Sequence, residues 1–247
     1  MSPASDERRA QLAANLAAVR AQIERACELA GRSPEEVTLI AVTKTFPAED
    51  VRLLAELGVR DFGENRHQEA QEKVAEVADP ELTWHFVGQL QANKARAVAE
   101  YAAVVHSVDR VRLVDALRRA VAGREQPLRC LVQVDLSDPD GVDGVDRPGG
   151  AGGRGGVPPD QVAEVAGAVA AAPGLVLGGV MAVAPLGVPP GPAFARLAGV
   201  ATEVRTEHPE ATWVSAGMSA DLEDAIAHGA THVRLGRRLL GERSYDR

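Results

Sequence analysis

The chain has 247 residues, of which 45% are hydrophobic and 25% charged, and a net charge of -8. This composition is that of an ordinary soluble domain with one large core, and the length suits a single α/β barrel. The acidic balance, without a sustained Lys/Arg block, argues against nonspecific nucleic-acid binding but allows a small local anion site.

The cysteines and the N-terminal sequence indicate a cytoplasmic protein. Cys27 and Cys130 lie far apart and form no CxxC pair, so we expect two reduced thiols and no disulfide framework. The stretch MSPASDERRAQLA has no apolar core, and no signal peptide is expected. Residues 165–195 carry no charge over a length that would span a membrane. Pro173-Gly174 and a Pro/Gly-rich tail divide them, which favours a helix end, a turn and a buried strand.

The first predicted element is a long amphipathic helix over residues 6–30, closed by Gly31. Eight short apolar runs follow, alternating with helical patterns. The runs span residues 37–42, 59–63, 83–88, 103–108, 128–136, 175–183, 211–217 and 231–236. The helical patterns lie near residues 48–57, 66–78, 91–100, 109–122, 158–171, 193–206 and 219–228.

This alternation predicts a single (β/α)₈ TIM barrel over residues 1–247, with the helix at 6–30 packed outside it. Strands joined by crossover helices pair in parallel, and eight of them in about 250 residues fit a closed barrel. The alternative is an open sheet of the Rossmann type, but no G-x-G-x-x-G follows the first strand. Residues 140–156 are nearly half glycine and predict a flexible loop, which we interpret as a tolerated surface insertion rather than a lid.

Chemistry in such a barrel gathers at the C-terminal ends of the strands. The residues at these ends are Lys44, Glu64-Asn65, Gly88-Gln89 (with His85 inside that strand), 217–221 and 234–238. The last two loops are glycine-rich and follow strands seven and eight, where barrels hold phosphate. Gly217 and Gly236 would allow close backbone approach, and Ser219 would cap the next helix. The alternative is that both glycines serve only the turns.

Lys44 at the barrel mouth, opposite a phosphate site, suits Schiff-base chemistry with an aldehyde. The aldehyde cofactor that also carries a phosphate is pyridoxal 5′-phosphate. The alternative for Lys44 is a surface lysine or one paired with a carboxylate. Arg234, inside an apolar strand, needs a partner, either an ion pair or the ring nitrogen of the cofactor. Since Arg stays protonated, that nitrogen would stay unprotonated and be a weak electron sink.

Metal binding has little support in the sequence, and no metal is expected. No two histidines form an HxH or HExxH spacing. The six histidines are His67, His85, His106, His208, His228 and His232.

The sequence resembles the pyridoxal phosphate homeostasis proteins almost from end to end. The matching stretches, in order, are LIAVTKTFP, GVRDFGENRHQEAQEK, WHFVGQLQANKAR, VVHSVDR, GGVMAV, GMSADLEDAIAHGATHVRLG and LLGER. The resemblance implies a barrel like the N-terminal domain of bacterial alanine racemase, with pyridoxal 5′-phosphate held as an internal aldimine on Lys44. It places Gly236 at the phosphate and Arg234 at the pyridine nitrogen. The further residues that it places near the cofactor are Asn65, Ser215, Met218 and Ser219, with His85 and Met181 fitting a core position equally well.

Two features depart from the family pattern. Arg237 follows the strand-eight glycine where the family usually has Thr or Ser, which bears on how the phosphate is held. The loop after strand five is longer than usual. The resemblance implies a carrier that sequesters the cofactor and passes it to apo-enzymes. We expect a monomer. The competing hypothesis is an amino-acid racemase, which needs a second acid/base, and neither Tyr101 nor Tyr245 is in an evident position to act.

Overall fold

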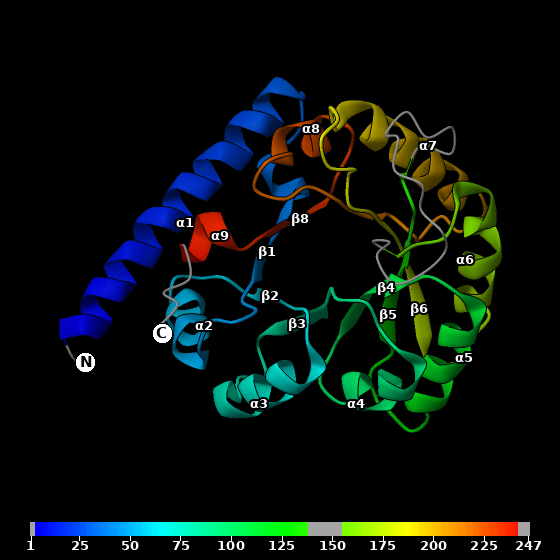
Figure 1. Ribbon diagram of the computed structural model, residues 1–247, viewed down its shortest axis with the longest axis horizontal. Coiled ribbons are helices and arrows are strands. Elements are labelled where there is room, and N and C mark those ends of the chain that lie inside the picture. The colour runs from blue at the N-terminus through cyan, green and yellow to red at the C-terminus, as the bar shows by residue number, and fades with distance from the viewer. Residues whose placement is uncertain (1–2, 138–154, 242–247) are drawn as a thin grey trace.

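The computed structural model describes residues 3–137 and 155–241 (Figure 1). Residues 140–154 of the predicted glycine-rich loop therefore lie outside the described residues. Eight parallel strands close into a barrel in which neighbours follow sequence order and β8 pairs with β1. The strands are β1 (Thr38–Val42), β2 (Asp61–Glu64), β3 (Thr83–Phe86), β4 (Val104–Val108), β5 (Leu128–Gln133), β6 (Leu175–Met181), β7 (Trp213–Ser215) and β8 (His232–Leu235). The predicted barrel is confirmed, and the open Rossmann-type sheet is wrong.

Helices surround the strands, as Figure 1 shows. They are α1 (Pro3–Leu29), α2 (Ala48–Glu56), α3 (His67–Val77), α4 (Ala95–Ala99), α5 (Val111–Ala120), α6 (Val162–Ala170), α7 (Gly191–Glu207), α8 (Leu222–Ala227) and α9 (Arg237–Leu240). Short 3₁₀ turns span Pro34–Glu36, Ala92–Lys94 and Pro159–Gln161. The uncharged residues 165–195 contain the end of α6, all of β6 and the start of α7. Within the described chain, no helix combines the length and apolar character needed to cross a bilayer.

Helix α1 lies along the outside of the barrel (Figure 1), as predicted. Its Leu16 belongs to an apolar cluster with Val51 of α2 and Leu239 of α9. One turn further, Val19 joins a second cluster with Val233 of β8. The apolar stripe of α1 therefore covers the seam where β8 closes onto β1.

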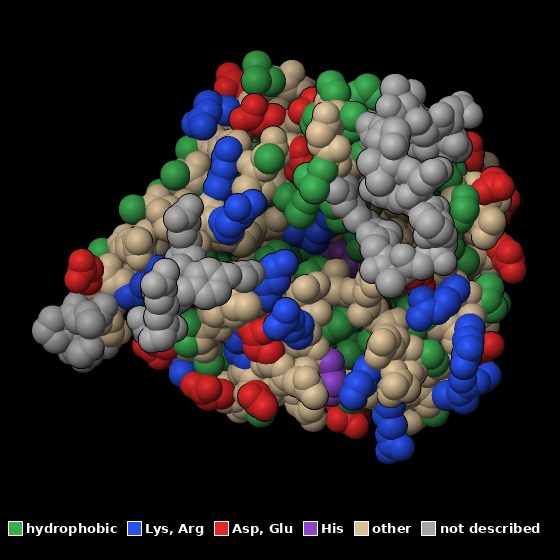
Figure 2. Space-filling model, in the orientation of Figure 1, with side chains coloured by type: hydrophobic (Ala, Val, Ile, Leu, Met, Phe, Trp, Pro, Cys, Tyr) green, Lys and Arg blue, Asp and Glu red, His purple; other side chains and the backbone are tan. Residues whose placement is uncertain are grey.

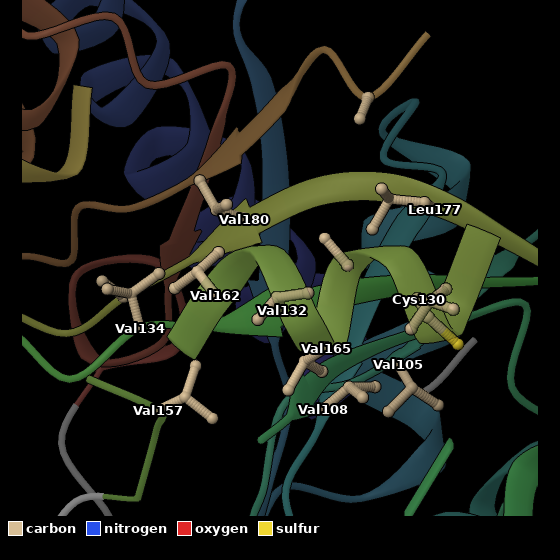
Figure 3. Packing of buried hydrophobic residues seen from close by; sticks show 14 of the residues in the cluster. Val105, Val108, Cys130, Val132, Val134, Val157, Val162, Val165, Leu177 and Val180 are labelled. Carbon is tan, nitrogen blue, oxygen red and sulfur yellow. The ribbon is translucent and has the colours of Figure 1, made fainter. Parts of the chain in front are cut away.

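The largest apolar cluster fills the space between the strands and the helical ring. Figure 3 shows Val105 of β4 and Val132 of β5 beside Val165 of α6. Cys130 is buried in this cluster, and burial raises the pKa of its thiol to about 12. Burial also raises the pKa of Cys27, and both cysteines are free thiols.

Strand β8 has an outward apolar face and an inward polar face. On β8, Val233 and Leu235 pack outward against the cluster of α1. His232 and Arg234 occupy the other face of the same strand, and both are buried. Barrel interiors are usually filled by branched apolar side chains, so these polar groups need partners.

Candidate functional site

A hollow marks the centre of the barrel face in Figure 2, with Lys/Arg and His side chains at its bottom. The residues that sequence reasoning assigned to the site lie at the C-terminal ends of the strands or inside the barrel.

Lys44 lies in a turn directly after β1 and is half-buried. Within residues 3–137 and 155–241, it forms no hydrogen bond or ion pair. The next residue, Thr45, has φ 69°, a left-handed conformation that a β-branched residue rarely adopts. The turn that carries Lys44 is therefore strained and must be held by its surroundings.

A buried ion pair holds this turn. The Lys73 ammonium on α3 donates to the Thr43 carbonyl at 2.7 Å and to Glu64 Oε1 at 2.6 Å. The Glu69 carboxylate accepts the Thr45 backbone N–H and also lies 3.2 Å from the Lys73 ammonium. Hydrogen bonds therefore fix the backbone on both sides of Lys44, at Thr43 and at Thr45. We call Glu64, Glu69 and Lys73 the turn clamp.

Burial has the largest effect on the pKa of Glu64 in the turn clamp. Burial raises the pKa of Glu64, whereas the Lys73 charge and the Thr43 hydroxyl, which donates at 2.7 Å, oppose that rise. Sequence reasoning missed the clamp. The available signal was the i,i+4 pair Glu69/Lys73 on a helix that begins just after the strand-end Glu64.

Asn65 follows β2 and packs against the loop after β3. A Cβ on Gly88 would lie 2.1 Å from the Asn65 carbonyl oxygen and 2.6 Å from its Oδ1. Only glycine therefore permits this approach of the two loops. The half-buried Asn65 side chain lies beside Gly88 at the mouth of the barrel.

Arg234 is buried in the middle of β8. Its Nη1 donates to Ser215 Oγ at 2.6 Å and its Nη2 to the Ala182 carbonyl at 2.9 Å. Burial lowers the pKa of Arg234 to about 10, partly offset by the nearby Asp221 charge. Among the described residues, no carboxylate forms an ion pair with it. The interpretation of Arg234 as half of a direct structural ion pair is therefore wrong.

His85 has both ring nitrogens engaged inside the barrel. Its Nε2 lies 2.9 Å from Asp61 Oδ1, and its Nδ1 lies 2.9 Å from Nε2 of His106. The Nδ1 of His106 in turn lies 2.9 Å from Ser215 Oγ. Sequence reasoning did not single out His106. Its signal was a polar ring inside the mostly apolar run VVHSV.

The loop after β7 differs in part from its prediction. Gly217 has φ 92°, and a Cβ there would lie 2.7 Å from the Cβ of Ala225, so packing against α8 already requires this glycine. Ser219 does not cap the helix, because α8 begins at Leu222 and its N-cap is Asp221. Asp221 instead accepts the Met218 backbone N–H at 2.6 Å. The predicted cap was wrong because the turn is two residues longer than the pattern indicated.

The loop after β8 lies beside the end of β1. A Cβ on Gly236 would lie 3.2 Å from the Val42 carbonyl oxygen, two residues before Lys44. Arg237 is exposed and is the first residue of α9. Met181, the last residue of β6, is buried and pairs in register with Ser215.

Tyr101 lies in the turn after α4 and stacks on His67, with ring centroids 6.0 Å apart. Its ring packs against the outer apolar clusters, outside the strands. Tyr245 lies outside the described residues. No group of three or more His, Cys, Asp or Glu in the described ranges is arranged to hold a metal ion.

The family model for the alanine racemase N-terminal domain matches residues 14–244. A pyridoxal phosphate homeostasis protein from Mycobacterium leprae is 41% identical over 95% of this chain and 94% of its own length. The chain belongs to the pyridoxal phosphate homeostasis protein family.

Solved structures agree with this membership. PipY, a Synechococcus elongatus family member solved with PLP bound, shares 35% identity and a TM-score of 0.78. The match covers 94% of this chain and all of PipY. Alanine racemase from Corynebacterium glutamicum, at 17% identity and TM-score 0.64, shares only the fold, and the match covers 62% of its length.

Proposed function

We propose that this family member binds pyridoxal 5′-phosphate covalently through Lys44 and serves as a carrier in cytoplasmic cofactor homeostasis. The observation that carries the proposal is Lys44 itself. It is a half-buried lysine without a described partner, in a strained turn held by the turn clamp. Its neighbours in the family include PipY, which was solved with PLP bound.

The chemistry asked of Lys44 is a condensation. Lys44 would hold the cofactor through a C=N bond to its aldehyde carbon, formed with loss of the carbonyl oxygen and two amine hydrogens as water. Lys44 suits this role because no ion pair within the described residues holds its amine away from the cofactor. The turn clamp fixes the backbone on both sides of the amine.

The remaining residues have separate proposed roles. Arg234 faces the pyridine nitrogen with Ser215 beside it, and Gly236 with Ser219 and Met218 border the phosphate. Asn65 and Met181 flank the cofactor at the ends of β2 and β6. His85 acts from inside the barrel, since both its nitrogens already have partners.

A carrier fits these residues better than a racemase. An arginine donates to the pyridine nitrogen without protonating it, which leaves the ring a weak electron sink. A two-base racemase also needs a second acid/base near the cofactor. Tyr101 is the one described tyrosine, and it packs outside the strands.

The test is titration with pyridoxal 5′-phosphate, followed by absorbance, on three variants. Lys44→Ala and Lys44→Arg should stay folded and lose the Schiff-base band, the second despite keeping its charge. Lys94→Ala removes an exposed lysine and should leave the band unchanged. A full band in Lys44→Arg contradicts the assignment of Lys44.

Two further assays separate carrier from enzyme. Loaded protein mixed with an apo-enzyme that needs the cofactor should restore its activity faster than the rate of spontaneous release into buffer. Time-dependent racemisation of any amino acid, lost in Lys44→Ala, would support the racemase instead.

A further inference from the structure

A chain of hydrogen bonds crosses the barrel interior from Arg234 to Asp61. It passes from Arg234 to Ser215, His106, His85 and Asp61, with successive distances of 2.6, 2.9, 2.9 and 2.9 Å. The side chains come from five strands, β8, β7, β4, β3 and β2. We call these five residues the barrel relay.

The two ends of the barrel relay lie at opposite mouths. Ser215 ends β7, and Arg234 bonds the Ala182 carbonyl just after β6, so this end reaches the proposed cofactor site. Asp61 begins β2, and its side chain is 26% exposed. It lines a cleft of about 410 Å³ between α1 and the starts of β1 and β2. Protons can therefore reach the relay from the mouth remote from the cofactor.

The chemistry of the two ends dictates the direction of every bond. A guanidinium only donates, and an ionised carboxylate only accepts. With Asp61 accepting, His85 must carry its proton on Nε2, and its Nδ1 is then an acceptor. His106 must donate from Nε2, so its Nδ1 accepts the Ser215 hydroxyl proton. Ser215 Oγ is thereby free to accept from Arg234.

The opposite tautomers are excluded by geometry when both rings are neutral. Moving the proton of His106 to Nδ1 would set two lone pairs against each other at 2.9 Å. Moving that of His85 to Nδ1 would set a lone pair against the Asp61 carboxylate. One added proton on His85 reverses the chain instead. His106 then donates to Ser215 Oγ, which already accepts from Arg234, and the Ser215 proton must turn to another acceptor.

We propose that Asp61, His85 and His106 are positioning residues for Arg234, joined in a one-way relay that fixes its guanidinium and couples it to protonation at the far mouth. The relay links Arg234, a buried cation without a direct carboxylate partner, to the Asp61 carboxylate through three neutral groups. The nearby Asp221 charge also stabilises the guanidinium. The effect on cofactor binding rests on the function proposed above, whereas the relay itself does not.

Other charged and titratable groups surround the relay. Burial lowers the pKa of His106 well below its usual value, and the Arg234 charge adds to this. Beside it, His232 stacks on Trp213 at 3.9 Å between centroids, and the Arg129 guanidinium lies 4.4 Å over the same indole. Burial and the Arg234 charge keep His106 neutral, as the one-way relay requires.

The first test uses the protein without cofactor. Nitrogen-15 NMR of the histidine rings at pH 8 should show His85 and His106 protonated on Nε2 alone. The two N–H groups of Arg234 that donate should give separate, slowly exchanging signals. In His106→Phe these signals should merge, because the guanidinium can rotate. A proton on Nδ1 of His106 overturns the relay, as do Arg234 signals unchanged in His106→Phe.

The second test adds pyridoxal 5′-phosphate. His106→Phe should raise the dissociation constant about 10-fold, the effect expected when a buried hydrogen-bond chain is cut. The matched control is His232→Phe, another buried histidine, whose ring nitrogen bonds Thr231 rather than the relay, and it should change the constant less than twofold. Equal effects of the two variants contradict the positioning role. If the unaltered protein takes up no cofactor, the proposed function fails while the NMR result still decides the relay.

Discussion

At the residue scale, the site depends on groups that hold Lys44 rather than on Lys44 alone. Thr45 is held in a left-handed conformation, and Lys73 is buried with only 5% of its side chain exposed. A cation so deeply buried is tolerated because Glu64 and the Thr43 carbonyl satisfy it. The strain at Thr45 is therefore maintained by the turn clamp.

Lys73→Met should lower the free energy of unfolding by about 3–5 kcal/mol, because it leaves the Glu64 carboxylate buried and unpaired. The double variant Lys73→Met/Glu64→Leu should recover most of this loss. Urea unfolding of the three proteins measures both effects. A single variant as stable as the double variant would mean that the ion pair does not hold the turn.

The loss of unfolding free energy caused by Lys73→Met should also depend on pH. The pKa of Glu64 is raised in the folded protein, so its carboxylate form is the costly one, and removing Lys73 raises this pKa further. Glu64 therefore favours folding most below its unfolded pKa, and this is lost as pH rises through the folded pKa. The variant should lose less stability at pH 5 than at pH 8. An equal loss at both values contradicts the role of Glu64.

Asp221, not Ser219, should stabilise the turn before α8. Asp221→Ala removes the bond to the Met218 N–H and should cost about 1 kcal/mol. Ser219→Ala should change stability by less than about 0.5 kcal/mol, since it caps nothing. Thermal unfolding of the two variants checks the order, and the reverse order would restore Ser219 as the cap.

At the element scale, loops close on one another across the mouth. Gly88→Ala should cost roughly 1–3 kcal/mol and weaken cofactor binding, because a methyl group there meets Asn65 at 2.1 Å. Gly167→Ala within α6 is the matched control. A Cβ at Gly167 meets nothing within 4 Å, so alanine should stabilise the helix by about 0.5–1 kcal/mol. If both variants changed the free energy of unfolding in the same direction, the two loops would not be in close contact at Gly88.

The elements themselves could be predicted from sequence, whereas their lateral contacts could not. Period-2 and period-3.6 patterns, bounded by Gly and Pro, predict the eight strands and helices α1 to α8 to within a few residues. The short helix α9 (Arg237–Leu240) was not predicted. The barrel relay joins residues as far apart as Asp61 and Arg234, and such contacts depend on the register in which strands meet. One buried polar residue within an apolar run, such as His106, shows only that a partner exists. The sequence likewise did not show that the turn before α8 is longer, because both Ser219 and Asp221 are residue types that favour the N-cap position.

At the scale of the whole molecule, the barrel is closed by its surroundings as well as by its strands. Helix α1 lies over the β8–β1 seam with Leu16 only 3% exposed. Leu16→Ala should lower the free energy of unfolding by about 2–5 kcal/mol. Because Leu16 is on the outer layer, the absorbance of bound cofactor should not change. A spectral change would show that α1 also shapes the site.

The buried histidines should make the whole barrel acid-sensitive. Burial lowers the pKa of His232 to about 3, and that of His106 falls as well, so both are neutral when folded. They contribute stability above the unfolded pKa near 6.5, and this is lost as pH falls toward their folded values. We expect stability to fall below pH 6.5, and less steeply in His232→Phe. If stability fell with pH as steeply in His232→Phe as in the unaltered protein, His232 would not be a source of the acid sensitivity.

The central claim is the proposal that Lys44, in the turn after β1, holds the aldehyde of the cofactor. The most direct test is to load the protein with pyridoxal 5′-phosphate, reduce it with borohydride and map the modified residue by mass spectrometry. The account predicts a single stable adduct on Lys44. An adduct on another lysine, or none, would contradict it.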